Sequence, residues 1–402
     1  MKLFQRLLVA PAALGLLAPM TANANEVNFN AISNYTDVEN LEFANSFDDT
    51  FDNNVEFEPL IAGGEGMVPD YDTDSFSETT TASFSLDMGI GAVDGQGVTT
   101  TVTDGNEAIT ATYGFQIDLN TSFTGEDSLD ISIDAGNSSA TILGINEFDG
   151  NATGDALQVD GVSYTFPLGD KTTIFVGDNM DGSTLYNTAC VYGGLTNTLD
   201  DCGNANSAMA GGSGTAAGAS FDIGNGFTAA IGYTGAGSDA NGLLTKEGTD
   251  VFGGQLTYIA DSYGASVTYA NAETATSSTD TTAVADGDVT YWGLNGYWTP
   301  SESGSMPSIS VGYEMGDPEK AGEKDTTHYF VGLQWDEVGP GTFGAAIGTT
   351  AHTAENAAEY LMYEAFYSYP VNDGMTITPV VYIKETSGTD TTGVMVKSSF
   401  SF

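Results

Sequence analysis

The chain has 402 residues, of which 55 are Asp or Glu and only 8 are Lys or Arg, so its formal net charge is −47 at pH 7. This acidity argues against nucleic-acid binding, because contact with phosphates needs a basic surface that displaces counterions. The same acidity is also typical of a solvated surface in a salty medium.

Residues 1–24 have the pattern of a secretory signal peptide. Lys2 and Arg6 form a short basic start, an apolar stretch follows, and Ala22-Asn23-Ala24 fits a small-residue cleavage site. We therefore expect cleavage before Asn25 and export from the cytoplasm. After this segment no stretch approaches the ~20 apolar residues that a spanning helix needs. The mature protein is therefore either soluble or a membrane β-barrel.

Residues 25–78 are acidic and show little alternation of apolar and polar residues. We predict a loosely ordered N-terminal segment on the periplasmic side. Asp70, Asp72 and Asp74 have the spacing of a calcium loop, but the Gly and Glu that such a loop needs further on are missing. Calcium binding there remains an alternative, and we expect no metal site.

From Thr79 onward, apolar and polar residues alternate with period two, which is typical of strands with one apolar face. Many of these segments are about ten residues long, enough for a tilted strand to cross an apolar band ~25 Å tall. Residues 79–402 are thus predicted to form an all-β transmembrane antiparallel barrel of about sixteen strands. The predicted strand centres are residues 87, 114, 131, 163, 175, 219, 231, 255, 268, 293, 311, 331, 346, 364, 380 and 397.

The connections between these segments alternate in length. Short ones, such as Gly169-Asp170 and Asn372-Asp373-Gly374, are followed by long ones, such as residues 137–156 and 179–214. Outer-membrane barrels have short periplasmic turns and longer external loops on alternate ends. A soluble β-sandwich has no physical reason to keep this asymmetry.

The third long loop, roughly residues 179–214, is the longest and contains both cysteines of the chain, Cys190 and Cys202. In an exported protein two cysteines most simply form one disulfide. Large porins often fold a long third loop into the barrel, so we expect this loop to narrow the lumen. Its acids would then lie near the constriction: Asp178, Asp181, Asp200 and Asp201.

If the alternating apolar residues face lipid, the residues between them face the lumen. This parity predicts the following pore-lining residues: Asp87, Asp118, Asp130, Asp134, Asp222, Glu364, Lys384 and Lys397. Charges of both signs along a pore set its selectivity. The alternative, which the sequence weights equally, is that these groups only solvate a polar lumen.

Signals of catalysis are weak. The only histidines, His328 and His352, are assigned to a strand start and a loop, and neither a nucleophile elbow nor a zinc-protease motif is present. We therefore expect neither enzymatic activity nor a cofactor. An outer-membrane barrel enzyme is the remote alternative, because it would need a Ser–His pair in or beside the barrel.

The opening MKLFQRLLVAPAALGLLAPMTANANEVNFNAISNY, the segments FQIDLNTSFTGEDSLDISIDAGN and VDGVSYTFPLGDKTTIFVG, and the ending VKSSFSF resemble cyanobacterial outer-membrane porins, which are related to the carbohydrate-selective porins. This resemblance implies a passive channel for sugars, inorganic ions and other small solutes. It also implies that Phe402 is the C-terminal signal for barrel insertion. Family members usually carry an S-layer-homology domain and a coiled coil that bind peptidoglycan. Residues 25–78 are too short for these and lack heptads, so peptidoglycan tethering is in doubt.

The sequence therefore predicts an outer-membrane porin embedded in lipid, trimeric by analogy, through which small hydrophilic solutes diffuse passively. Because the mature chain has so few cationic side chains, we expect the pore to disfavour anions. The rival from another class is a surface structural or adhesion protein without pore activity. Such a protein would not need Phe402 at its terminus.

Overall fold

The structure is a computed structural model. It describes residues 79–94, 109–138, 147–148, 150–200, 202, 214–236, 242–245, 248–273, 288–301, 306–319, 322–388 and 390–402. The predictions for residues 1–24 and 25–78 lie outside this part of the chain. Among the described residues, no helix combines the length and apolar character needed to cross a lipid bilayer.

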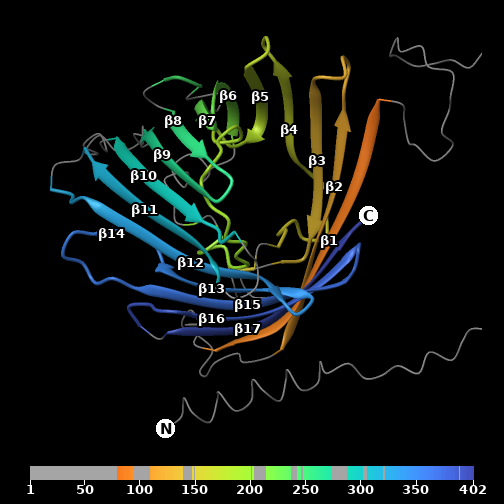
Figure 1. Ribbon diagram of the computed structural model, residues 1–402, viewed down its shortest axis with the longest axis vertical. Helices are drawn as coiled ribbons and strands as arrows, with labels where there is room; N and C mark the ends of the chain where they lie inside the picture. Colours follow the sequence, from red (N-terminus) through yellow and green to blue (C-terminus); the bar gives the residue numbers. More distant parts are fainter. Residues whose placement is uncertain are drawn as a thin grey trace, which may run out of the picture. The chain divides into compact units, whose positions relative to one another are not determined.

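Sixteen strands form a closed antiparallel barrel in which each strand pairs with its neighbours in the sequence and β17 returns to pair with β1 (Figure 1). The strands are β1 (Thr80–Asp94), β2 (Thr110–Thr121), β3 (Ser128–Gly136), β4 (Gln158–Pro167), β5 (Thr172–Met180), β6 (Gly214–Gly224), β7 (Phe227–Gly235), β8 (Asp250–Ile259), β9 (Tyr263–Ala272), β10 (Val289–Trp298), β11 (Ser308–Pro318), β12 (Thr326–Val338), β13 (Gly341–Thr349), β15 (Leu361–Asn372), β16 (Met375–Lys384) and β17 (Thr391–Ser401). Every predicted strand centre falls inside one of them, so the predicted fold class is confirmed.

A further short strand was not predicted. β14 (Thr353–Ala354) lies in the connection between β13 and β15 and pairs with Thr326 and Thr327 at the start of β12. It folds a long connection back onto the barrel end and does not interrupt the ring, because β13 pairs directly with β15.

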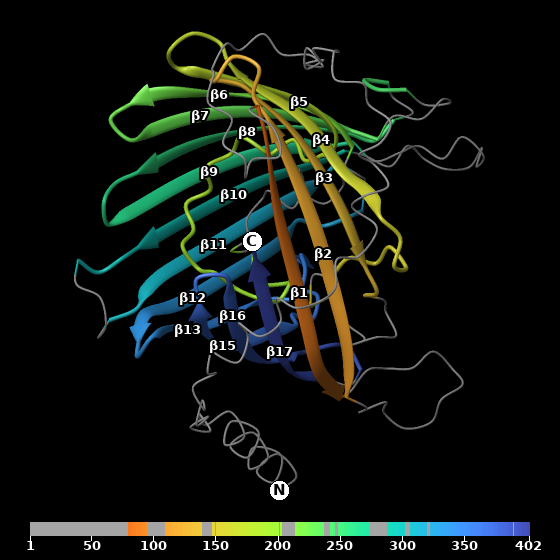
Figure 2. The same cartoon turned by 90° about the vertical axis from the view of Figure 1, so that its right-hand side faces the viewer.

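The barrel has an apolar outer face and a largely polar inner face, as the period-two pattern requires. Outward side chains such as Met88, Ile231 and Val311 are among the exposed large hydrophobic residues. Inward positions on neighbouring strands carry small polar groups, and Thr257, Thr268 and Ser310 are buried. Strands run obliquely around the barrel axis (Figure 2), which is the tilt that closing a sheet requires.

Two local features show how the sequence closes this ring. At the β6–β7 hairpin, Asn225 and Gly226 both have positive φ, 55° and 84°, which is the conformation of a two-residue turn that matches strand twist. At the seam, the terminal Phe402 exchanges two backbone hydrogen bonds with Phe84 of β1, at 2.9 and 3.0 Å. Their rings also stack, with centroids 5.7 Å apart. The last residue thus extends the β1–β17 pairing.

Candidate functional site: the barrel lumen

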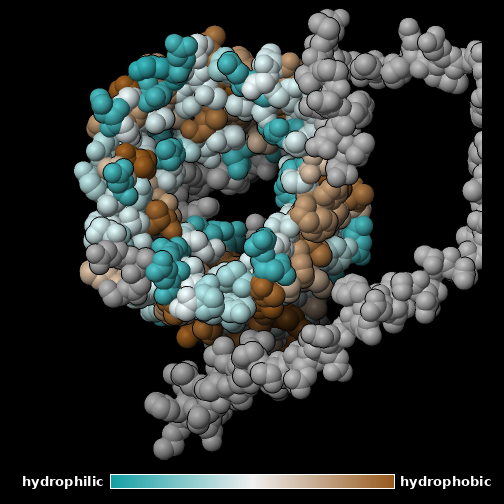
Figure 3. All heavy atoms as spheres, turned by 45° about the vertical axis from the view of Figure 1, so that its right-hand side comes forward, coloured by the Kyte–Doolittle hydropathy of each residue, from teal (hydrophilic) through white to brown (hydrophobic). Residues whose placement is uncertain are grey.

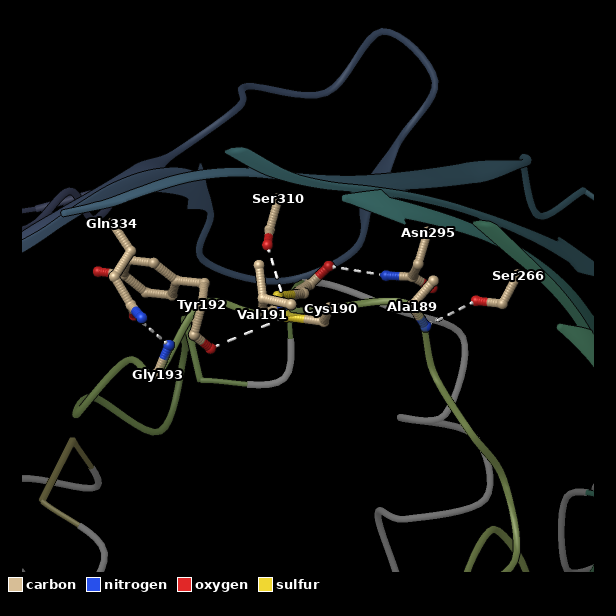
Figure 4. Close-up of a disulfide and its surroundings, with 10 residues drawn as sticks. Ala189, Cys190, Val191, Tyr192, Gly193, Ser266, Asn295, Ser310 and Gln334 are labelled. Atoms are coloured by element: carbon tan, nitrogen blue, oxygen red, sulfur yellow. Dashed lines mark hydrogen bonds between the residues drawn. A yellow bond between two sulfur atoms is a disulfide. The ribbon is translucent and has the colours of Figure 1, made fainter. Parts of the chain in front are cut away.

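Loop 3 is the connection of residues 181–213 between β5 and β6, of which residues 181–200 and 202 are described. Its described part lies against the inner wall of the barrel, and Figure 4 shows the region around the disulfide. Every second backbone N–H from Asn187 to Gly193 donates to a wall side chain. The four bonds are Asn187 to Gln255 of β8 (2.8 Å), Ala189 to Ser266 of β9 (3.2 Å), Val191 to Ser310 of β11 (3.1 Å) and Gly193 to Gln334 of β12 (2.9 Å). Residues 187–193 therefore run across the strands in an extended conformation, and side chains of the wall accept hydrogen bonds from the N–H groups along one edge of this segment.

Further along, loop 3 is held by Glu364 of β15. Its buried carboxylate accepts hydrogen bonds from the Tyr192 hydroxyl at 2.7 Å and the Thr196 N–H at 2.8 Å, and the Leu195 N–H lies 3.4 Å from both oxygens. A carboxylate that accepts several donors is a strong anchor, because charge-assisted hydrogen bonds are about twice as strong as neutral ones. Glu364 faces inward as predicted, but its side chain binds the loop.

An apolar core lies between loop 3 and the wall. Tyr192 and Leu199 of the loop pack with Phe330, Met362, Phe366, Tyr382 and Met395 of strands β12, β15, β16 and β17. The approach is close, because a Cβ on Gly332 of β12 would lie 2.7 Å from the Tyr192 ring. On this side of the barrel, buried side chains fill the space between loop 3 and the wall.

The predicted disulfide joins Cys190 and Cys202, whose Cα atoms are 6.3 Å apart. Both ends are tied to the wall: the residue before Cys190 binds Ser266, and the Cys202 carbonyl accepts from Asn295 Nδ2 of β10 at 3.2 Å (Figure 4). The disulfide thus closes a segment that already follows the inner wall.

The acids predicted for the constriction do not share one location. Asp181 and Asp200 are in loop 3, and Asp201 lies outside the described residues. The prediction for Asp178 was wrong, because strand β5 extends to Met180. Asp178 pairs with Val162 and lies two residues after the exposed Val176, so it belongs to the outer face, where its carboxylate accepts from Thr215.

On β2 and β3, Asp118, Asp130 and Asp134 lie on the inward face with Gln116 and Asn120. Asp118 accepts from Gln116 Nε2 (2.7 Å) and Ser132 Oγ (2.6 Å), and Asp130 accepts from Asn120 Nδ2 (2.6 Å) and Ser128 Oγ (2.6 Å). These partners all belong to the same two strands, and the three carboxylates are neither fully buried nor fully exposed. They form an acidic surface on the inner wall.

The two predicted lysines lie on β16 and β17, and both have anionic partners. Lys397 Nζ lies 2.7 Å from Asp87 Oδ2 of β1, whereas Lys384 binds Glu147. Asp222 follows the inward parity of the buried Ala216 on β6, but it lies at the strand end, where its carboxylate accepts from the Gly224 N–H of the turn at 2.8 Å.

Sequence reasoning identified residues 137–156 as a long connection but did not predict that this loop 2, residues 137–157 between β3 and β4, contacts the inner wall. Its described residues Glu147 and Phe148 are buried against the wall and loop 3, and Asn151 Nδ2 donates to the Phe115 carbonyl of β2. The only sequence feature that could have indicated this contact is a glycine on β1: a Cβ on Gly89 would lie 2.9 Å from the Phe148 ring. A glycine in a strand often marks such close approach, but this sequence has 51.

The two histidines, distant in the sequence, meet inside the barrel end. His328 lies near the start of β12 and His352 in the β13–β14 connection, as assigned, and their rings stack with centroids 5.6 Å apart. His352 Nε2 lies 2.8 Å from Glu314 Oε1 of β11, and both rings also bind threonine hydroxyls. No group of three or more His, Cys, Asp or Glu side chains in the described ranges is placed to hold a metal ion.

No protein-family model matches the chain, and no curated protein matches its sequence. Solved structures do resemble it. Pseudomonas putida OprB is 11% identical with a TM-score of 0.58, over 81% of this chain and 94% of that one. A loop L8 deletion mutant of Vibrio cholerae OmpT, an outer membrane protein, is 12% identical with a TM-score of 0.53 (81% and 99%). Salmonella typhi OmpF in complex with daunomycin is 12% identical with a TM-score of 0.52 (80% and 97%).

This chain has the porin fold. Within that fold the lumen is unevenly divided. Loop 3 is bonded to the wall between β8 and β16, whereas Asp118 and Asp130 accept hydrogen bonds from neutral side chains of β2 and β3. Figure 3 shows the molecule hollowed at its centre, with hydrophilic residues around the hollow. The arrangement offers a polar passage.

Proposed function

We propose that the chain is an outer-membrane porin that lets small hydrophilic solutes diffuse passively and disfavours anions. One observation carries the proposal: a closed barrel, apolar outside and polar inside, holds a long loop inside it, bonded to the inner wall through Asn187–Gly193. A soluble barrel would have no use for an apolar outer face, and a purely structural one would need no narrowed lumen.

The charge distribution supports the expected ion preference. Lys384 and Lys397 are the only Lys or Arg residues on the described strands, and each is paired with a carboxylate. Asp118, Asp130 and Asp134 have neutral hydrogen-bond partners or none among the bonds described above. An uncompensated negative wall raises the local concentration of cations and lowers that of anions.

Finer parts of the proposal rest on the sequence. They are a signal peptide cleaved after residue 24, insertion guided by Phe402, and relationship to the cyanobacterial and carbohydrate-selective porins. The solute class that follows is sugars and inorganic ions. A homotrimer is proposed from the fold of the similar porins, which commonly assemble in this way.

The test is single-channel conductance of the purified, heat-modifiable protein in planar bilayers, with a salt gradient across the membrane. We expect discrete conductance steps and a reversal potential of cation-selective sign. A chloride-selective reversal potential would overturn the ion preference alone. Folded protein that never conducts would overturn the porin function, and complete extraction from membranes by urea would favour a surface structural protein.

A further inference from the structure

Lys384 and Lys397 lie on the neighbouring strands β16 and β17, six residues apart in register, because Lys384 pairs with Thr391 and Lys397 with Thr378. One dipeptide of loop 2 contacts both lysines. Glu147 Oε1 forms an ion pair with Lys384 Nζ. The neighbouring Phe148 ring lies beneath Lys397 Nζ, 5.4 Å from the ring centroid, which is within the range of a cation–π interaction. Glu147 and Phe148 are both buried, at 3% exposure each.

Glu147 also holds loop 3. Its carboxylate accepts from the Thr198 N–H at 3.1 Å and the Thr198 hydroxyl at 2.9 Å, and its backbone carbonyl accepts from the Asn197 N–H at 3.3 Å. Lys384 Nζ donates to the same Thr198 hydroxyl at 3.0 Å. One carboxylate therefore joins three parts of the chain: the β16 wall, loop 2 and loop 3.

The Glu147 carboxylate has two separable roles. If its charge is removed, the Lys384 ammonium group loses its anionic partner, which costs free energy and extends the positive field of the lysine into the lumen. If its acceptor oxygens are removed, the partly buried N–H and hydroxyl of Thr198 in loop 3 lose their acceptor. The first effect changes which ions pass, and the second changes how firmly the loop is held.

We propose that Glu147 and Phe148 of loop 2 form a charge-masking element: together with Asp87 they neutralise the two strand lysines, and Glu147 is the positioning residue that fixes loop 3 at Thr198. The lumen stays anionic because its two strand lysines are paired with carboxylates and partly covered by loop 2. The functional consequence rests on the porin activity proposed above, whereas the masking itself does not.

Two substitutions separate the roles. Glu147→Gln removes the charge but keeps an acceptor oxygen, and Glu147→Ala removes both. We expect both variants to shift the cation-to-anion permeability ratio toward anions by about two- to fivefold, the effect of one unpaired charge ~10 Å from a hydrated ion. Only Glu147→Ala should add open-channel noise from a loosened loop 3. The control is Glu126→Gln, an exposed acid in the β2–β3 connection with the same change of charge.

A second measurement does not depend on conduction. In the folded wild-type protein, Lys384 should resist a membrane-impermeant amine-labelling reagent, and in Glu147→Ala its labelling rate, read by mass spectrometry, should rise about tenfold or more, as the loss of roughly 1.4 kcal/mol of protection implies. If a Glu147 variant does not fold, Lys384→Met provides the test, because it should leave Glu147 uncompensated and increase cation preference.

Reversal potentials of Glu147→Gln equal to those of Glu126→Gln, or Lys384→Met indistinguishable from wild type, would overturn the proposal while leaving the pore intact. Rapid labelling of Lys384 in the wild-type protein would overturn it even if the protein does not conduct. Absence of conductance in the wild type together with a protected Lys384 would refute the porin function and retain the masking.

Discussion

Inward carboxylates on two parts of the barrel wall obey the same parity and have different partners. On β2 and β3, Asp118 and Asp130 accept from side chains of those strands. On β15, Glu364 accepts from Tyr192, Leu195 and Thr196 of loop 3. The first group leaves an acidic surface toward the lumen, and the second anchors a loop. Parity determines the face on which a residue lies, but tertiary contacts determine what its charge does.

The comparison predicts that neutralising the acidic surface of β2 and β3 has the largest effect on ion preference. Replacing Asp118, Asp130 and Asp134 together by Asn should abolish most of the cation preference, because three carboxylates without cationic partners are removed while their shape is kept. Reversal potentials in a salt gradient measure this. Unchanged potentials would show that these groups only solvate the lumen.

Glu364→Ala is expected to change the stability of the protein more than its ion preference. Removing this carboxylate leaves buried donors of loop 3 without partners, which costs about 1–3 kcal/mol for an unsatisfied buried group. We expect a lower unfolding temperature in heat-modifiability gels, noisier channels and a small change of reversal potential. The matched control is Asp130→Ala, which should change the potential more than the stability. If the two variants changed the unfolding temperature and the reversal potential equally, Glu364 and the acids of β2 and β3 would not differ in role.

Reduction of the disulfide is expected to have an intermediate effect. In the chain-entropy argument, a bridge between residues with a sequence separation of 12 stabilises by about 3 kcal/mol, mostly through the unfolded state. The backbone bonds of Ala189 and Cys202 to the wall should keep loop 3 in the lumen without it. Cys190→Ser/Cys202→Ser should therefore unfold earlier and fluctuate more at a similar mean conductance. Identical noise before and after reduction would contradict a stiffening role.

The sequence was informative where a regular period specifies structure. Alternation located all sixteen barrel strands and the inward faces of β2, β3 and β15, because the side-chain period of a strand is two. It failed where the chain leaves that period. Asp178 was assigned to the loop because it is followed by Asn179, a residue typical of turns, although the strand extends to Met180. Glu147 was missed because nothing in an irregular loop shows that it reaches Lys384, 237 residues away. Such long-range contacts depend on which loop occupies the lumen.

The β2–β3 part of the wall has no hydrogen bond to loop 3 among those described above, so its own turn should carry more of its local stability. Asp127 accepts from the Tyr164 hydroxyl at 2.6 Å, and from the Ser122 hydroxyl and the Phe123 and Thr124 N–H groups at 2.7–3.0 Å. The Tyr164 hydrogen bond foremost, with those of Thr124 and Ser122, holds the pKa of Asp127 well below its ordinary value of 3.8. The ionised carboxylate is thus favoured by the folded turn.

The smallest predicted effect follows from this lowered pKa. A depressed pKa in the folded state contributes stability that is present above the unfolded value, near pH 4, and is lost as the pH falls toward the folded value. Asp127→Asn should therefore unfold a few degrees below wild type at pH 7, and this gap should narrow as the pH falls below about 4. Unfolding temperatures of the two proteins between pH 7 and pH 2 measure it. A gap that stays constant with pH would mean that the turn needs the shape of the side chain and not its charge.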